Sequence, residues 1–382
     1  PVNPLNDSLL SLKKKAKAFW YNILPSDVKV NEIWPEKQVS RNDQQVTALD
    51  FVFRPNQKGS YNYEPDLGMV TNNWGGMMKA LSSSARNLLD ENIEYIEFWV
   101  KIIDAPVGAK LNIDLGQISE DVLVNKTLDT EDKTPANGLL DEGEDTGFDK
   151  VLDFAEIGYS SVDNPDPSGD NFYFQNTQIN NPEYFQNING TEGNGKLTDL
   201  GRIPDTEDLN GNTTLDAVNS YFNYVVPLDT SRANNPFIAG GGGDRDWYLI
   251  QIPLKDVAKS VGNPQLTIIN TIRLWVTDVA SEVHFRVAEF NLVGNQWQKL
   301  LTKDVTKDDE VLTLSTINIE DNPEYSSPPG VFREKDKSNT EETVLANEQS
   351  LLMKFDGLKD GDKREIVKYL GRELNVFNYK EM

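Results

Sequence analysis

The apolar residues of this chain repeat one strand pattern twice. Residues 93–100 read I-x-x-I-x-F-W-V, and residues 269–276 read I-x-x-I-x-L-W-V. Each run is followed, after a short loop, by a strand with alternating apolar positions, at 110–115 and at 283–287. Apolar runs of this length, bounded by polar loops, are typical of buried strands. A repeated strand unit favours two related β modules over one mixed α/β domain.

Further strands are expected on both sides of these runs, and helices are few. Apolar stretches at 46–53, 221–228 and 247–254 predict strands, and the glycines within 74–81 predict a tight bend or a bulge. Residues 9–20, which contain three adjacent lysines, predict a short amphipathic helix.

The order of these elements predicts an all-β fold: two jelly-roll (galactose-binding/carbohydrate-binding-like) β-sandwich modules with long acidic loop insertions and few short helices. Trp99 and Trp275 lie inside apolar runs and are expected in two separate cores. The expected divisions are an N-terminal segment at 1–40, a first module at 41–125, an acidic Asn/Asp/Gly-rich insertion at 126–220, a second module at 221–300, and a linker with the start of a third, truncated module at 301–382.

Charge and composition exclude several classes of function. Sixty-one acidic residues against 37 basic ones give a formal charge of −24. Such a surface repels phosphate backbones and anionic lipid, so we expect no nucleic-acid partner. The chain has no cysteine, so no disulfide or thiol chemistry is available. No apolar run reaches the roughly 18 residues of a membrane-spanning helix.

The acidic loops carry the sharpest candidate chemistry. Oxygen side chains alternate within 205–216, and carboxylates surround three glycines within 137–149. Calcium binds six to eight oxygens, and crowded like charges repel each other without a cation. We therefore expect calcium as a cofactor, and the alternative is that both loops contact only solvent. The expected ligands are Asp208, Asn210, Asn212, Thr214 and Asp216 in the first loop, and Asp141, Glu144, Asp145 and Asp149 in the second.

Catalysis has little support in the sequence. His284 is the only histidine, and its alternation with Val283 and Phe285 places it on the face opposite the core, as a structural residue. One histidine without any cysteine nearly excludes His-paired nucleophile systems. Acidic residues are numerous, but nothing singles out a pair for glycoside hydrolysis. We expect no catalytic residue and no enzyme activity.

Several segments, kept in order over most of the chain, resemble the SprA/Sov family. Each motif alone is modest in specificity, whereas together they are specific. The segments lie at 61–63, 73–81, 92–99, 114–123, 137–149, 207–212 and 346–351.

This resemblance implies a role in protein secretion. SprA/Sov proteins form the giant outer-membrane translocon of the type IX secretion system of the Bacteroidota, which gliding motility also needs. The chain would be an internal fragment from an extramembrane region, at the cell surface or in the periplasm, of a much longer β-barrel protein. Its partners would be other parts of the parent translocon, accessory proteins and secreted cargo. It would act as a non-enzymatic scaffold and protein-contact surface, since the family brings no catalytic residue.

A second hypothesis is a secreted carbohydrate-binding β-sandwich array, which the jelly-roll pattern alone suggests. Glycan binding needs exposed aromatic rings on one face of the sandwich. Trp74, Trp247 and Trp297 are the candidates. The hypothesis therefore depends on the exposure of these indoles.

Overall fold

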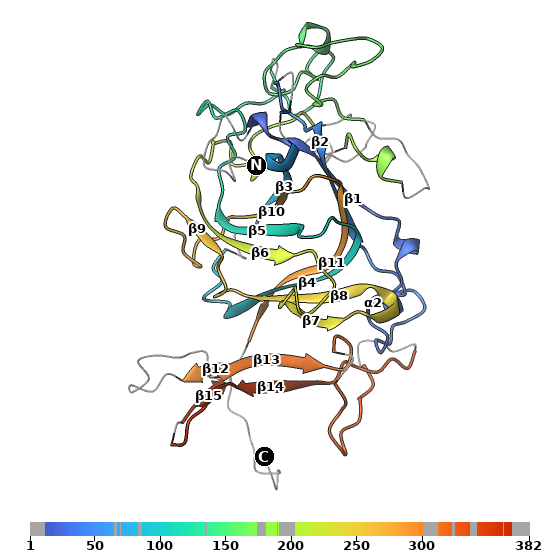
Figure 1. Ribbon diagram of the computed structural model, residues 1–382, viewed down its shortest axis with the longest axis vertical. Coiled ribbons are helices and arrows are strands. Elements are labelled where there is room, and N and C mark those ends of the chain that lie inside the picture. The colour runs from blue at the N-terminus through green and yellow to red at the C-terminus, as the bar shows by residue number, and fades with distance from the viewer. Residues whose placement is uncertain are drawn as a thin grey trace.

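Two antiparallel sheets pack against each other in the computed structural model (Figure 1). The six-stranded sheet runs in the order β1 (Ala16–Asn22), β2 (Leu49–Lys58), β11 (Val283–Gly294), β4 (Ile93–Asp104), β8 (Trp247–Pro253) and β7 (Ile238–Gly241). The five-stranded sheet runs β3 (Trp74–Ala80), β10 (Thr271–Thr277), β5 (Lys110–Gln117), β6 (Ser220–Pro227) and β9 (Lys259–Val261). The structure describes residues 12–64, 67–68, 70–82, 86–133, 136–173, 181–188, 190, 203–295, 297–300, 312–322, 325–336, 342–361 and 363–368.

Both repeated strands lie inside the same sandwich, one in each sheet. Ile96, Phe98 and Val100 of β4 share one buried cluster with Leu274 and Val276 of β10. The all-β class is therefore confirmed, while the jelly-roll topology stays a prediction.

The strand pairing differs from the expected division into two modules. β4, from the first expected module, lies between β8 and β11, from the second. The physical reason is that a repeated apolar pattern specifies a buried strand but not its neighbours. Here the inward faces of the two similar strands bury each other within one core.

The six-stranded sheet is buried on both faces. Its outer face carries Trp99 and Val52, which pack under residues 23–48, including α2 (Val30–Ile33). The rings of Trp34 and Trp99 meet edge to face, with centroids 5.8 Å apart. Because both faces of the sheet are covered, β4 has apolar residues at the consecutive positions 98–100 instead of alternating apolar and polar residues. Trp99 is buried as expected, on the face opposite the shared core.

A buried carboxylate anchors the outer face of the five-stranded sheet. Asp114 of β5 accepts hydrogen bonds at Oδ2 from Arg273 Nε, at 2.7 Å, and from Trp275 Nε1, at 2.8 Å. Its Oδ1 accepts from Asn223 Nδ2, at 2.7 Å. Asp114 and Arg273 are both fully buried. Three neighbouring strands are therefore joined by side chains as well as by their backbones.

Asp50 plays the same part in the six-stranded sheet. It accepts from Arg286 Nε at 2.6 Å, lies 2.9 Å from His284 Nε2, and receives the Tyr21 hydroxyl at 3.3 Å. Burial acts to raise the pKa of Asp50, but the hydrogen bonds from His284 and Arg286 outweigh it and lower the pKa. His284 is on the face away from the shared core, as expected, and it is buried there.

Residues 16–20 form a strand where the lysine-rich pattern predicts a helix. β1 pairs with β2 along its whole length and buries Phe19 and Tyr21 on one face. The helix prediction is wrong for these residues, because pairing with β2 decides between two periods that a short stretch satisfies equally. Residues 12 and 13 are helical, as expected, and residues 9–11 lie outside the described residues.

The glycines of β3 serve close packing. A Cβ on Gly75 would lie 2.7 Å from the Ala18 Cβ and 2.8 Å from the Phe53 ring. A Cβ on Gly76 would lie 2.5 Å from the backbone oxygen of Leu274. The pairing of β3 with β10 runs without a register shift, so the predicted bend or bulge is replaced by a regular strand.

The insertion and the C-terminal strands lie at opposite ends of the long axis (Figure 1). In its described part, the insertion contains turns and short 3-10 helices such as η4 (Asp153–Ala155) and η5 (Pro182–Tyr184). At the other end, β12 (Trp297–Leu300) pairs with β15 (Glu365–Lys368), and β13 (Leu312–Asn318) pairs with β14 (Gln349–Phe355). The expected start of a third module at 373–382 lies outside the described residues. Among the described helices, none is long and apolar enough to cross a membrane.

The shared core predicts a single unfolding transition for the sandwich. Phe98→Ala in β4 and Val276→Ala in β10 should both lower the same transition in chemical denaturation. The first should cost about 3–5 kcal/mol, the usual range for a large buried aromatic residue. Phe332→Ala, at a side chain that is 85% exposed, is the control and should cost far less. Two transitions, each shifted by only one core substitution, would contradict the shared core.

Candidate metal centre in the acidic insertion

The first expected calcium loop is held by hydrogen bonds within the loop. The Asp208 carboxylate accepts from the backbone amides of Asn212, at 3.0 Å, and Thr213, at 2.6 Å. Asn212 Oδ1 accepts from the amide and hydroxyl of Thr214, and Asn210 Nδ2 donates to Asp216 Oδ2 at 2.8 Å. All five expected ligands thus lie in one turn. Calcium at this loop stays a prediction.

The same turn occurs a second time. Residues 120–129 read EDVLVNKTLD, and residues 207–216 read EDLNGNTTLD. The Asp121 carboxylate accepts from the amides of Asn125 and Lys126, each at 3.0 Å, as Asp208 does from the matching positions. Lys126 and Thr213 occupy the same place in the turn, and both have a positive φ, 63° and 64°.

The glutamate of each repeat binds the other repeat. Glu207 accepts from the amides of Val122, Leu123 and Asp129 at 2.5, 3.1 and 3.0 Å. Glu120 accepts from Asn210 Nδ2 at 3.2 Å and from the amide of Asp216 at 3.4 Å. Two backbone bonds, from Glu120 N to Asp216 O and from Glu207 N to Asp129 O, complete the exchange. The two repeats therefore form one reciprocal pair.

The second expected loop takes part in a similar pair. Glu144 accepts from the amides of Lys133, at 3.0 Å, and Asp141, at 2.9 Å. Glu131 accepts from the amides of Thr146 and Gly147 at 3.1 and 2.8 Å. Asp141 and Glu144 thus belong to a hydrogen-bonded pair of turns.

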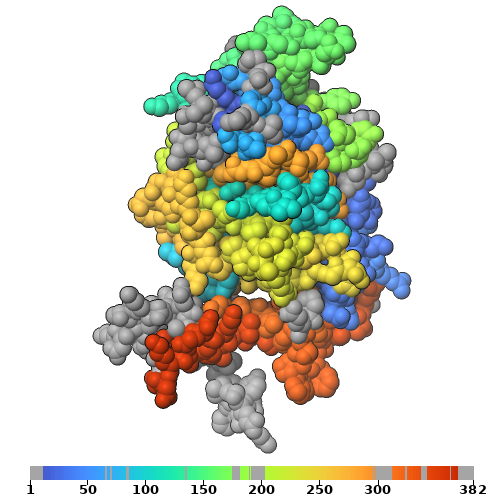
Figure 2. All heavy atoms as spheres, in the orientation of Figure 1, coloured from blue at the N-terminus to red at the C-terminus, as the bar shows by residue number. Residues whose placement is uncertain are grey.

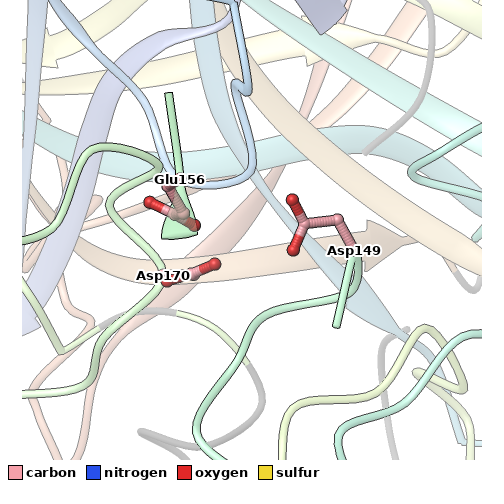
Figure 3. A group of neighbouring side chains, drawn as sticks. All are labelled: Asp149, Glu156 and Asp170. Atoms are coloured by element: carbon pink, nitrogen blue, oxygen red, sulfur yellow. The ribbon is translucent and has the colours of Figure 1, made fainter. Parts of the chain in front are cut away.

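Asp149, the fourth expected ligand of that loop, belongs to a different group. Its carboxylate lies with those of Glu156 and Asp170, and their oxygens are within 4.8 Å of one another. Asp170 also belongs to a second such group, with Asp153 and Asp166. Figure 3 shows Glu156 and Asp170 together, with the Asp149 carboxylate facing them. The four expected ligands are therefore not brought to one site.

Turns of the chain set the positions of these carboxylates. Glu156 accepts from Ser168, through the amide at 3.0 Å and through the hydroxyl at 2.6 Å. Asp166 Oδ1 accepts from the amides of Gly169 and Asp170 at 2.7 and 3.2 Å. Asp149 Oδ1 accepts from the amide of Val151 at 2.9 Å. We name the set Asp149, Glu156 and Asp170 the carboxylate triad.

Asp170 is the most constrained member of the triad. It is 5% exposed, and its Oδ2 has no hydrogen-bond partner. Burial raises its pKa to about 8, and the charges of Glu156, Asp166 and Asp149 contribute to the rise. A Cβ on Gly147 would lie 2.0 Å from that oxygen, so only glycine leaves room for it.

The lysines around the triad donate hydrogen bonds to other residues. Lys133 Nζ donates to the Thr146 hydroxyl at 2.8 Å, Lys58 Nζ to the Pro167 carbonyl at 2.8 Å, and Lys17 Nζ to Asn187 Oδ1 at 2.7 Å. Within the described part of the chain, no lysine or arginine forms an ion pair with the triad or with Asp153 and Asp166. The triad is thus a group of carboxylates without a cationic partner among those residues.

Sequence reasoning missed Glu156 and Asp170. The signal for Asp170 is the segment 166–170, Asp-Pro-Ser-Gly-Asp, which has the alternation of acid and glycine that drew attention to 137–149. Glu156 carries no local signal, because it reaches the site through the turn between η4 and Ser168.

The buried glutamates predict an unusual pH dependence. Burial raises the pKa of Glu131 to about 7, from an ordinary value of 4.5. Between these values the folded state keeps a proton that the unfolded state has lost. The stability that this group contributes is complete below about pH 4.5 and is lost as the pH rises through 7. With divalent cations chelated, the free energy of unfolding should therefore fall from pH 5 to pH 8, by up to about 1.4 kcal/mol per pH unit for one proton.

Chemical denaturation at a series of pH values measures this profile. Glu131→Gln keeps an oxygen acceptor but cannot titrate, so its profile should be flatter than that of the unsubstituted chain. An unsubstituted profile that is level or rises between pH 5 and pH 8 would show that the buried carboxyl is ionised in the folded state.

Comparison with known proteins identifies the family. Residues 155–382 match the SprA_N family, which is described as a motility related/secretion protein. The match covers the second half of the insertion, strands β6 to β15, and the C-terminal residues. No curated protein matches the chain. The resemblance drawn from the sequence motifs is confirmed, and the chain belongs to the SprA_N family of motility related/secretion proteins.

Proposed function

We propose that the chain is a non-enzymatic extramembrane region of a large outer-membrane translocon for type IX protein secretion. There it acts as a structural scaffold and a protein-contact surface. Membership of a secretion and motility family supports the secretion role. The proposed partners are other parts of the parent translocon, its accessory proteins and secreted cargo.

Exposed apolar side chains on the insertion carry the proposal of a contact surface. Phe154, Ile157 and Val162 are 68%, 72% and 84% exposed. Apolar residues gathered on one segment and rimmed by polar groups are typical of protein-binding sites. We name these three residues the apolar tip.

The backbone under the apolar tip is held in place. Ser160 and Asn164 exchange two backbone hydrogen bonds of 3.0 Å, and Glu156 binds Ser168. A surface that is already ordered loses less conformational entropy when a partner binds. The green part of the insertion projects from one end of the molecule, away from the C-terminal strands (Figures 1 and 2). These features support a surface that is presented to another protein.

The sandwich supplies the scaffold. Its two sheets share one core, and the buried anchors Asp50 and Asp114 tie neighbouring strands together. The only histidine, His284, is one of the partners of Asp50. A structural role for it supports a non-enzymatic function. The net charge of −24 disfavours non-specific binding to anionic surfaces.

The carbohydrate-binding alternative gains no support from the indoles. Trp74 and Trp247 are 1% and 2% exposed, so neither ring face can stack on a sugar. Trp297 is half-buried at the start of β12. A glycan platform of several coplanar rings is therefore not favoured.

Truncating the apolar tip should weaken contact with the partner. Phe154→Ala, Ile157→Ala and Val162→Ala, combined in the parent protein, should reduce secretion of a reporter cargo. The affinity for the partner should fall about tenfold or more, because central apolar contacts each contribute more than about 1 kcal/mol. The melting temperature should stay close to that of the unsubstituted chain, since these side chains are exposed. Secretion assays and pull-down of the parent complex measure both effects.

A matched control truncates exposed apolar residues elsewhere. Val107 and Phe332 are 105% and 85% exposed, so Val107→Ala with Phe332→Ala tests loss of exposed apolar area alone. Normal secretion by the tip variant would refute the contact surface.

In-frame removal of the sandwich, together with the insertion that it carries, tests the scaffold role. Its strands run from residue 16 to residue 294, so deletion of 16–294 from the parent should stop or misdirect secretion. A normal secretion profile after this deletion would refute the scaffold role.

A further inference from the structure

The carboxylate triad has the geometry of an ion site. Oxygens bound to one calcium ion at roughly 2.3–2.6 Å lie at most about 5 Å apart. The ligand oxygens of Asp149, Glu156 and Asp170 meet this limit, since all lie within 4.8 Å of one another. They come from three turns of one segment and converge from different sides (Figure 3).

The triad also contains a buried oxygen that has no hydrogen-bond partner. In the paired repeats, the carboxylates of Asp208, Asp121 and Glu131 accept two or more backbone amides each. The side chain of Asp170 is only 5% exposed, and its Oδ2 accepts no hydrogen bond. A buried oxygen without a partner costs free energy unless a ligand supplies the missing interaction.

We propose that Asp149, Glu156 and Asp170 bind one calcium ion. Carboxylate oxygens are hard ligands, and the described groups contain no histidine or cysteine that would favour zinc or copper. The ligands come from irregular turns, which suit the flexible geometry of calcium better than the strict octahedron of magnesium. Backbone carbonyls and water would complete the coordination. Asp153 and Asp166 add negative charge beside the ion and are not required as ligands.

The ion explains how so many acids share one place. Lys17, Lys58 and Lys133 act electrostatically on carboxylates of the triad or beside it, and each is hydrogen-bonded to another residue. A divalent ion would neutralise two charges at once and join positions 149 and 170. It would thereby close the segment that bears the apolar tip. The site itself does not rest on the proposed function.

Calcium titration of the whole chain, stripped with a chelator, tests the site by calorimetry and by thermal melting. The unsubstituted chain should bind calcium and melt at a higher temperature as calcium is added. Asp170→Asn should lower the affinity of one site by roughly tenfold or more. It should also remove most of the calcium-dependent rise in melting temperature. Without calcium, Asp170→Asn should melt no lower than the unsubstituted chain, because asparagine is neutral and nearly the same shape as the buried carboxyl group it replaces. Glu156→Gln should give the same loss if the asparagine variant fails to fold.

Two controls separate this site from other acidic turns. Asp163→Asn removes an exposed carboxylate from the same segment and should leave the calcium response unchanged. Asp208→Asn alters the paired repeats and should leave the site at Asp170 intact. The proposal is overturned if millimolar calcium changes nothing in the unsubstituted chain. It is also overturned if Asp170→Asn and Glu156→Gln respond as the unsubstituted chain does, or if magnesium acts equally well.

Discussion

Backbone amides that are withdrawn from water must find acceptors, and in and beside the insertion several of these acceptors are carboxylates. Glu131, Glu207 and Glu120 are 0%, 3% and 5% exposed, and each accepts hydrogen bonds from a turn distant in sequence. In the sandwich the same need is met by strand ladders. The described part of the insertion has few strand ladders, so buried acids take over this role there. These buried acids are therefore part of the structure and do not belong to the charged surface.

The hydrogen-bond partners of a buried carboxylate decide whether its pKa is lowered or raised. Asp50 has Arg286 and His284 as partners, and its pKa is lowered. Glu131 has only amides, and burial raises its pKa. In the carboxylate triad, Asp170 Oδ2 has neither a cationic partner nor an amide that donates to it. Within one chain, the same functional group thus serves as an anchor, as an acceptor for turns and as a candidate ligand. The local supply of positive charge sets the difference.

The sequence predicts the strands far better than it predicts their partners. Apolar residues at Ile96, Phe98 and Val100 fix a buried strand, because burial leaves a direct mark on residue type. Whether that strand meets β8 or another module depends on pairing across about 150 residues, which no local pattern records. The four consecutive apolar positions of β1, residues 18–21, fit a helix until β2 is known.

The candidate site shows the same limit at shorter range. The loop 208–216 can be predicted from the sequence because all its oxygens are close in sequence. The sequence groups Asp149 with Asp141 for the same reason, although its spatial neighbours are Glu156 and Asp170. The turn at Ser168 and the space above Gly147 bring these residues together. Only the folded backbone shows that geometry.

The reciprocal exchange between 120–129 and 207–216 also has a temporal meaning. Its contacts join residues that are 78 to 96 positions apart. Contacts of such separation form late, because a long loop must close before any of them contributes. A chain that emerges with its N-terminus first must keep the amides of Val122 and Asp129 in water until Glu207 arrives. This end of the molecule can therefore close only after the chain has been synthesised past residue 216.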